Sequence, residues 1–215
     1  MKNYAFDLYV PVFCGGGASI DYNSRPQIDF DGKWIKPFVE FYDGEPYWEA
    51  WFLSSGTLTV NGNYIADMWV IGGGSLPNFR NSPYFAGNGH TQTVSGISLS
   101  TGQIPVTVGG GAANANNGGG TSSIGQFVSA AGGSPGVETT DVKYRFAAPD
   151  KAHEAGANGT RDPDSLYQIG HGGWLFWRSR AEYAGEGYGA GGGIYNGITI
   201  QENGHSGAAI IRIKI

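Results

Sequence analysis

The stretch at residues 51–74, WFLSSGTLTVNGNYIADMWVIGGG, carries the pattern that decides the fold. Aromatic residues, β-branched residues and threonine favour strands, and the apolar run at its end continues directly into three glycines. The same pattern, a short apolar strand followed at once by glycines, occurs as VFCGGG at 12–17, PVTVGGG at 105–111 and FVSAAGG at 127–133. The repetition predicts a chain of strands that end in glycine segments.

The residues around this stretch also favour strands. Segments 29–42 and 47–60 are rich in Trp, Phe, Tyr, Val and Thr. Between 48 and 53 apolar bulk falls on both faces of the expected strand, because Trp, Ala and Phe alternate with Glu, Trp and Leu. Gly44 in YDGEP indicates a turn, and the Asn-Gly pair at 61–62 is typical of a hairpin.

The stretch HSGAAIIRIKI at 205–215 predicts a closing strand. Ala209, Ile211 and Ile213 would form one face, opposite Ile210, Arg212 and Lys214. Few windows repeat apolar residues at helical spacing without a glycine among them. A glycine in a helix interior costs roughly 1 kcal/mol relative to alanine. The predicted fold class is therefore all-β, with helix in less than roughly a tenth of the chain against a usual third.

The glycine runs favour a polyglycine-II-like backbone, a left-handed helix of about three residues per turn whose amide and carbonyl groups point outward. Neighbouring segments of this kind can satisfy one another laterally, and only glycine permits such close approach of main chains. Gly110→Val is accordingly expected to destabilise the protein strongly. The glycines expected to form this scaffold are Gly72, Gly73, Gly74, Gly109, Gly110, Gly111, Gly119, Gly120, Gly132, Gly133, Gly191, Gly192 and Gly193.

The composition indicates an ordered protein. Glycine accounts for 38 of the 215 residues, but 13% of the residues are aromatic, and a disordered chain would be poor in aromatics. A net charge of −5 without a basic run argues against nucleic-acid binding. The single Cys14 excludes an intrachain disulfide, and no apolar stretch is long enough for membrane insertion. The first residues lack the features of a signal peptide, so we expect synthesis in a cytoplasm.

These segments together resemble the glycine-rich domain of tail-fibre proteins from phages and prophages of Gram-positive bacteria. In that family an SGT strand leads to a glycine run, followed by a PVTVGGG-type strand, a GGTSSFG-type segment, an AAGG segment and a closing GxxIIR-type strand. The matching residues are Ser55, Gly56, Thr57, Val70, Gly72–Gly74, Val106, Val108, Gly109–Gly111, Gly119–Ser123, Gly125, Ala131–Gly133, Gly207 and Ile210–Arg212.

The resemblance implies a receptor-binding adhesin of a phage virion or phage-tail-like particle, in outline similar to polyglycine-II sandwich tail-tip adhesins. Its expected partners are a host cell-surface glycan or protein and other tail-fibre or baseplate proteins. The alternative is a structural cap or bridge of tail or baseplate without host contact. A homotrimer is one oligomeric state that the sequence leaves open.

The chain departs from the family pattern between about 138 and 185, where aromatic residues and arginine replace glycine. We therefore expect an adhesin domain over 48–215 that carries this region as an insertion. Residues 1–47 would form a β-rich segment that attaches to another particle protein or folds as a small domain of its own.

Two aromatic loops are the candidate receptor sites, because Trp, Tyr and Arg dominate binding hot spots and loops on a rigid scaffold carry recognition. The first lies in the insertion and the second within 75–90. Burial of WLFW at 174–177 in a local core, and ordinary packing of the second loop, are the alternatives. The candidate residues are Tyr144, Tyr167, Trp174, Trp177, Arg178, Arg180 and Tyr183, with Tyr84 and Phe85.

Catalytic, metal and cofactor motifs give no positive signal. The match of Gly187–Gly192 to GxGxxG lacks a βαβ context, and Trp34 stands where a calcium loop starting at Asp29 requires glycine. The four histidines have no zinc spacing, although a calcium ion near Asp162 and Asp164 stays open. We predict that the protein is not an enzyme, binds no cofactor and has no catalytic or metal-ligating residues.

Overall fold

The computed structural model describes residues 22–42, 44–76, 86–114, 117–135, 188–189, 191, 194–195, 200–201 and 203–215. Within these ranges the regular structure is antiparallel strand, apart from one 3-10 turn, η1 (Tyr22–Ser24). The predicted all-β fold class is confirmed.

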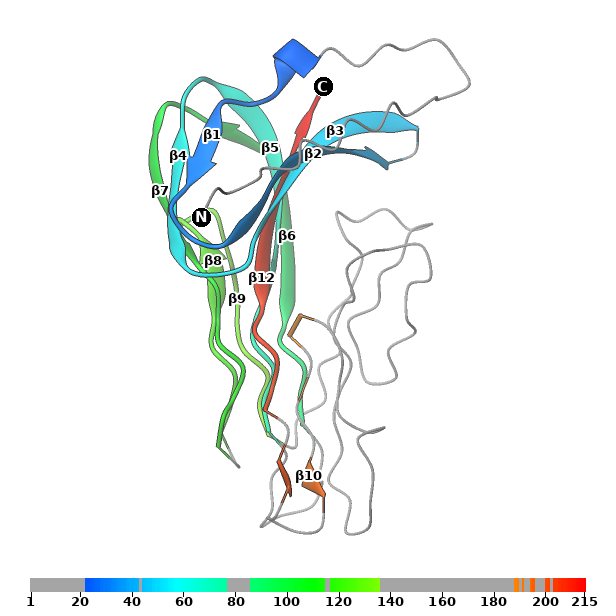
Figure 1. Ribbon diagram of the computed structural model, residues 1–215, viewed down its shortest axis with the longest axis vertical. Coiled ribbons are helices and arrows are strands. Elements are labelled where there is room, and N and C mark those ends of the chain that lie inside the picture. The colour runs from blue at the N-terminus through cyan, green and yellow to red at the C-terminus, as the bar shows by residue number, and fades with distance from the viewer. Residues whose placement is uncertain are drawn as a thin grey trace, which may run out of the picture.

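Most of the strands form two five-stranded sheets (Figure 1). Sheet A has the order β1 (Ile28–Phe30), β4 (Gly56–Val60), β7 (Gly102–Thr107), β8 (Ser122–Ile124) and β9 (Val128–Ala130). Sheet B has the order β2 (Trp34–Tyr42), β3 (Glu45–Phe52), β12 (Ala208–Lys214), β5 (Tyr64–Ile71) and β6 (Thr91–Leu99). A separate two-stranded ribbon pairs β10 (Ile194–Tyr195) with β11 (Ile200–Gln201).

The turn predicted at Gly44 is confirmed. β2 and β3 are neighbours with Tyr42 opposite Glu45, and Gly44 has φ +80°, a conformation that favours glycine. Both strands therefore form one hairpin of sheet B.

The hairpin predicted at Asn61-Gly62 is wrong, because β4 belongs to sheet A and β5 to sheet B. Gly62 donates its amide to Thr101 Oγ1 at 3.0 Å, and Thr101 lies in the connection by which the chain returns from β6 to β7. The chain thus crosses between the sheets twice here, from β4 to β5 and from β6 to β7, and the two crossings run side by side. The Asn-Gly turn therefore joins strands of different sheets, not neighbouring strands of one sheet.

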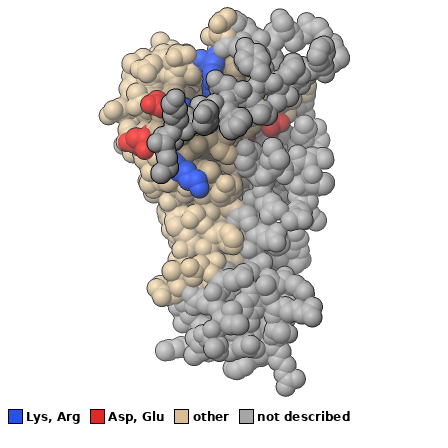
Figure 2. Space-filling view, viewed as in Figure 1, with Lys and Arg blue, Asp and Glu red and all other residues tan. Residues whose placement is uncertain are grey.

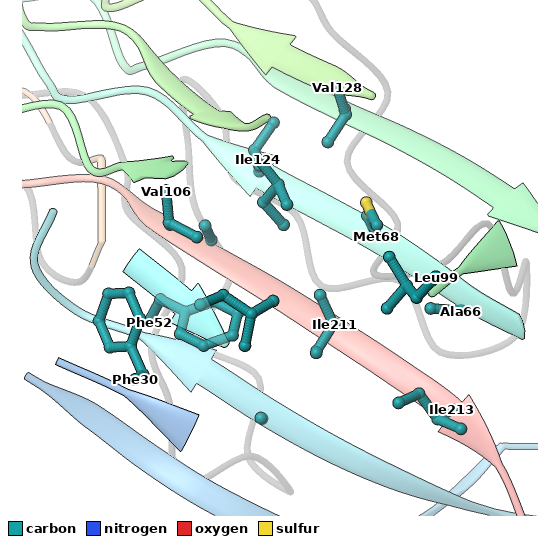
Figure 3. Close-up of a cluster of buried hydrophobic side chains, with 14 of the residues drawn as sticks. Phe30, Phe52, Ala66, Met68, Leu99, Val106, Ile124, Val128, Ile211 and Ile213 are labelled. Carbon is teal, nitrogen blue, oxygen red and sulfur yellow. The ribbon is translucent and has the colours of Figure 1, made fainter. Parts of the chain in front are cut away.

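The main core lies between the two sheets (Figure 3). Phe30 of sheet A packs on Phe52 of sheet B with ring centroids 4.7 Å apart. Along β12, Ala209, Ile211 and Ile213 face this core while Ala208 and Ile210 belong to a second cluster on the opposite face, so the predicted alternation is confirmed. The other buried members of the core are Trp48, Ala50, Leu58, Val60, Ala66, Met68, Val70, Leu99, Val106, Ile124, Val128 and Ala130.

The expected boundary between residues 47 and 48 falls within β3. β1 pairs with β4 and β2 pairs with β3, so residues 28–42 are built into the same two sheets as the strands that follow. An attachment segment separate from the sandwich is left to residues 1–21, which lie outside the described ranges.

Ile211→Ala should lower the free energy of unfolding by about 2–5 kcal/mol, because Ile211 is 1% exposed in the core and its truncation leaves a cavity. Ile65→Ala is the matched control, since Ile65 is 60% exposed and should cost less than about 1 kcal/mol. Urea denaturation of both variants measures the difference. Equal losses would contradict the assignment of the core to the space between the sheets.

Candidate functional site: a glycine bundle and the loops at its end

Six short segments continue the strands beyond the sandwich and run together (Figure 1). We name them the glycine bundle: 72–76, 86–90 and 203–207 adjoin β5, β6 and β12 of sheet B, whereas 109–113, 117–121 and 131–135 adjoin β7, β8 and β9 of sheet A. Three of the four predicted strand-then-glycine motifs therefore lead into the bundle. The motif at 12–17 lies outside the described residues.

Segment 72–76 is the centre of the bundle. All five of its residues are buried, and it hydrogen-bonds to each of the other five segments. Its carbonyls at Gly73 and Gly74 accept from the amides of Gly133 and Ala112 at 2.8 and 2.9 Å. In this segment the hydrogen bonds and close contacts are mostly between main chains, and Ser75 and Leu76 are the side chains that it buries.

The amides of the central segment point to three neighbours in rotation. Residues 72, 73 and 74 donate to segments 86–90, 117–121 and 203–207, and residues 75 and 76 donate again to the first and the second of these. The five N···O distances lie between 2.9 and 3.2 Å. A strand would direct its amides alternately to two sides in one plane, whereas this pattern repeats every three residues.

The bundle is packed too closely for side chains. A Cβ at Gly72, Gly73, Gly119 or Gly132 would lie within 3.0 Å of backbone atoms of a neighbouring segment, a distance that real Cβ atoms do not show. The same holds for Gly89, Gly109, Gly111, Gly133, Gly204 and Gly207. The predicted glycines Gly74 and Gly120 take part through their amides, and Gly191 donates to Asn88 Oδ1 at 3.2 Å. Gly192 and Gly193 lie outside the described residues.

Close approach, and not an unusual backbone conformation, is what demands glycine here. Among the described glycines of the six segments none has φ in the left-handed region. Gly110 is the exception to close packing, since a Cβ there meets no atom within 4 Å. The expectation that a branched residue at Gly110 would clash is therefore wrong, although its carbonyl does accept from the Gly120 amide at 2.8 Å.

Three buried polar side chains complete the hydrogen bonding of the bundle. Ser75 Oγ accepts from the Gly87 amide at 2.7 Å, Ser122 Oγ accepts from Gly109 at 2.9 Å, and Asn88 Oδ1 accepts from Gly191. Buried amides need such partners wherever no carbonyl faces them. The sequence alone predicted no structural role for these side chains, and the only signal was a small polar residue beside a glycine run.

The bundle directs loops to the end remote from the sandwich (Figure 1). The chain leaves this end after Leu76, returns by Ala86, leaves again after Asn114 and returns by Asn117. Leu76 donates to the Asn117 carbonyl at 3.2 Å, so two loops begin side by side. The connection that starts after Pro135 departs from the neighbouring segment 131–135.

The candidate receptor residues all lie outside the described ranges. Tyr84 and Phe85 belong to the connection between Leu76 and Ala86, whose two ends the bundle fixes. Those of the insertion are Tyr144, Tyr167, Trp174, Trp177, Arg178, Arg180 and Tyr183. Their role stays a prediction.

The charged residues of the described part lie in the sandwich, and the six bundle segments contain no Lys, Arg, Asp or Glu (Figure 2). Arg212 pairs with Asp67 at 2.9 Å and stacks over Tyr47, and a hydrogen bond and ion pair with Glu45 raise the pKa of the Lys214 ammonium. Within the described ranges, no three His, Cys, Asp or Glu side chains gather to hold a metal. Nor does any helix there have the length and apolar character to cross a bilayer.

Comparison with protein-family models and with curated protein sequences gave no match.

Gly73→Ala should lower the free energy of unfolding by at least about 2 kcal/mol, because its Cβ would overlap the Gly110 carbonyl and the backbone cannot yield cheaply. Gly110→Ala is the matched control. With open space around it, alanine there should stabilise the protein by about 0.4–1 kcal/mol through a less flexible unfolded chain. Thermal melting of both variants separates the two effects, and a Gly73→Ala midpoint equal to that of the wild type would refute close packing.

Proposed function

We propose that this protein is the adhesin of a phage tail fibre, tail tip or phage-tail-like particle, and that it recognises a host cell-surface glycan or protein. The observation that carries the proposal is the bundle around segment 72–76, whose five amides all have carbonyl partners and which delivers loop ends side by side at one end of the molecule. A rigid support with variable loops is the usual architecture of recognition proteins.

We further propose that the bundle is of the polyglycine-II type. The threefold rotation of the amides in segment 72–76 supports this, as does an approach of main chains so close that no Cβ fits between them. In such a lattice each segment is held on several sides, so the loop ends move little. Ligands then bind at a smaller cost in loop ordering.

The end of the bundle itself is uncharged, because its six segments contain no Lys, Arg, Asp or Glu. The bundle offers main chain and small polar groups at its end, and the loops that leave it carry Tyr84 and Phe85 in one case and the tryptophans of the insertion in the other. Aromatic rings bury large apolar area with little loss of conformational freedom, and their flat faces suit sugar rings.

Isolated protein should bind susceptible bacteria and leave resistant mutants that lack the receptor unbound, which flow cytometry with labelled protein measures. Binding only to purified tail or baseplate proteins would contradict the adhesin and support the structural cap or bridge.

Tyr84→Ala, Trp174→Ala and Trp177→Ala test the loops one at a time. A residue that contacts the receptor should weaken cell binding by about 1–3 kcal/mol when it is truncated. Circular dichroism on the same variants identifies losses that come from unfolding. Unchanged affinity in all three folded variants would move the receptor site away from both loops.

A further inference from the structure

Sheet B buries apolar side chains on both faces. Its inner face lies against sheet A, whereas Trp51, Trp69, Ile71, Ala208 and Ile210 form a second buried cluster on its outer face. Each of these five residues is at most 1% exposed, and none belongs to the core between the sheets. A five-stranded face cannot bury its own tryptophans, so another layer covers it.

The covered area has a definite limit. Reading β3, β12 and β5 across in register, the row Trp51–Ile210–Trp69 is buried. In the next row Glu49 is buried and accepts from Trp51 Nε1 at 2.6 Å, while Arg212 and Asp67 are partly exposed.

One row further from the bundle the face is more open to solvent, although Tyr47 in this row is half-buried and packs against the outer cluster. Lys214 has a side-chain exposure of 60%, and Ile65 is also 60% exposed. The cover therefore lies over the half of the outer face that adjoins the glycine bundle and stops at the charged row.

We propose that this covered face, which we name the outer face, is the docking surface for residues 136–187 of the same chain. Tyr188, the first described residue after that region, packs on Trp51 with ring centroids 5.8 Å apart. At the other end of the region, Pro135 closes the bundle segment 131–135. The two ends thus lie at the bundle and at the buried row of the outer face, the same half of the molecule that is covered.

The composition of this region suits the surface. It supplies Phe146, Phe176 and further aromatic side chains, which an apolar face with two tryptophans would accommodate.

Residues 1–21 are the other long part of the chain outside the described ranges, and the described chain that follows them begins away from the covered half of the outer face. The chain after them begins with η1, where Ser24 Oγ accepts from Trp48 Nε1 at 3.3 Å and Arg25 lies over the Trp48 ring. Trp48 faces the inner core and is paired with Ile213, near the end of β12 remote from the bundle.

This docking does not depend on the proposed function. It assigns to part of the aromatic insertion a structural task, and it separates residues that hold the insertion on sheet B from those left free for a receptor.

Site-directed cross-linking of the full chain tests the proposal. In a Cys14→Ser background, Leu53→Cys places a thiol at the partly buried rim of the outer cluster, and Ile65→Cys places one on the same face beyond the charged row. Both are labelled with a benzophenone maleimide, irradiated, and mapped by peptide mass spectrometry. We expect cross-links from position 53 to peptides within 136–187 of the same molecule. We expect no cross-links to these peptides from position 65.

Cross-links from position 53 to residues 1–21, a covalent dimer, or no cross-link in a folded labelled protein would each overturn the proposal. Hydroxyl-radical footprinting of the unmodified chain gives a readout without any substitution. Trp51 and Trp69 should be oxidised as slowly as the core residue Trp48, and much more slowly than Phe127, which is 42% exposed. Oxidation of Trp51 and Trp69 at the rate of Phe127 would show the outer face to be open and would also refute the proposal.

Discussion

The fold depends on the close approach of six main chains at glycines where no Cβ fits between neighbouring segments. In the sandwich, the two sheets are held apart by a layer of apolar side chains, from Phe30 and Leu58 on one side to Phe52 and Ile211 on the other. Beyond β5 and β12 that layer ends, and the carbonyl of Gly110 comes to lie where a Cβ of Gly73 would be. The two sheets thus continue into one bundle, because the residues that follow the strands of both sheets are largely glycine.

This change alters what stabilises the protein along its length. Burial of apolar area dominates in the sandwich, whereas the bundle offers little apolar area and depends on complete pairing of buried amides and carbonyls. Segment 72–76 illustrates the requirement, since each of its five amides has a carbonyl partner. Where the geometry leaves an amide without a carbonyl, Ser75, Ser122 or Asn88 supplies the acceptor. A substitution in the bundle is therefore expected to act through lost space or lost pairing, and one in the sandwich through a cavity.

Much of this could be predicted from the sequence, because local patterns report local structure. The alternation in β12 and the strand-then-glycine motifs followed directly from side-chain type and order. The Asn-Gly turn at 61–62 did not, since its partner is Thr101 and a turn preference does not identify which sheet receives the next strand. Gly110 was misjudged for a similar reason. In a run of three glycines, only the packing distinguishes a residue with open space around it from its two neighbours that face main chain.

The proposed docking of residues 136–187 depends on the second apolar face of sheet B. The sequence of β3 already placed apolar residues on both faces, and Trp51 and Trp69 are as deeply buried on the outer side as Trp48 is on the inner one. A chain that continues from the end of the bundle at Pro135 and returns to Trp51 at Tyr188 is tied at both ends to rigid elements. In the proposed docking, aromatic side chains against sheet B would fix the path of the backbone, and those on the other side would be presented in a defined geometry. A glycine bundle has too little side-chain surface to discriminate between ligands by itself, so in the proposed adhesin specificity has to come from segments that the scaffold holds and does not form.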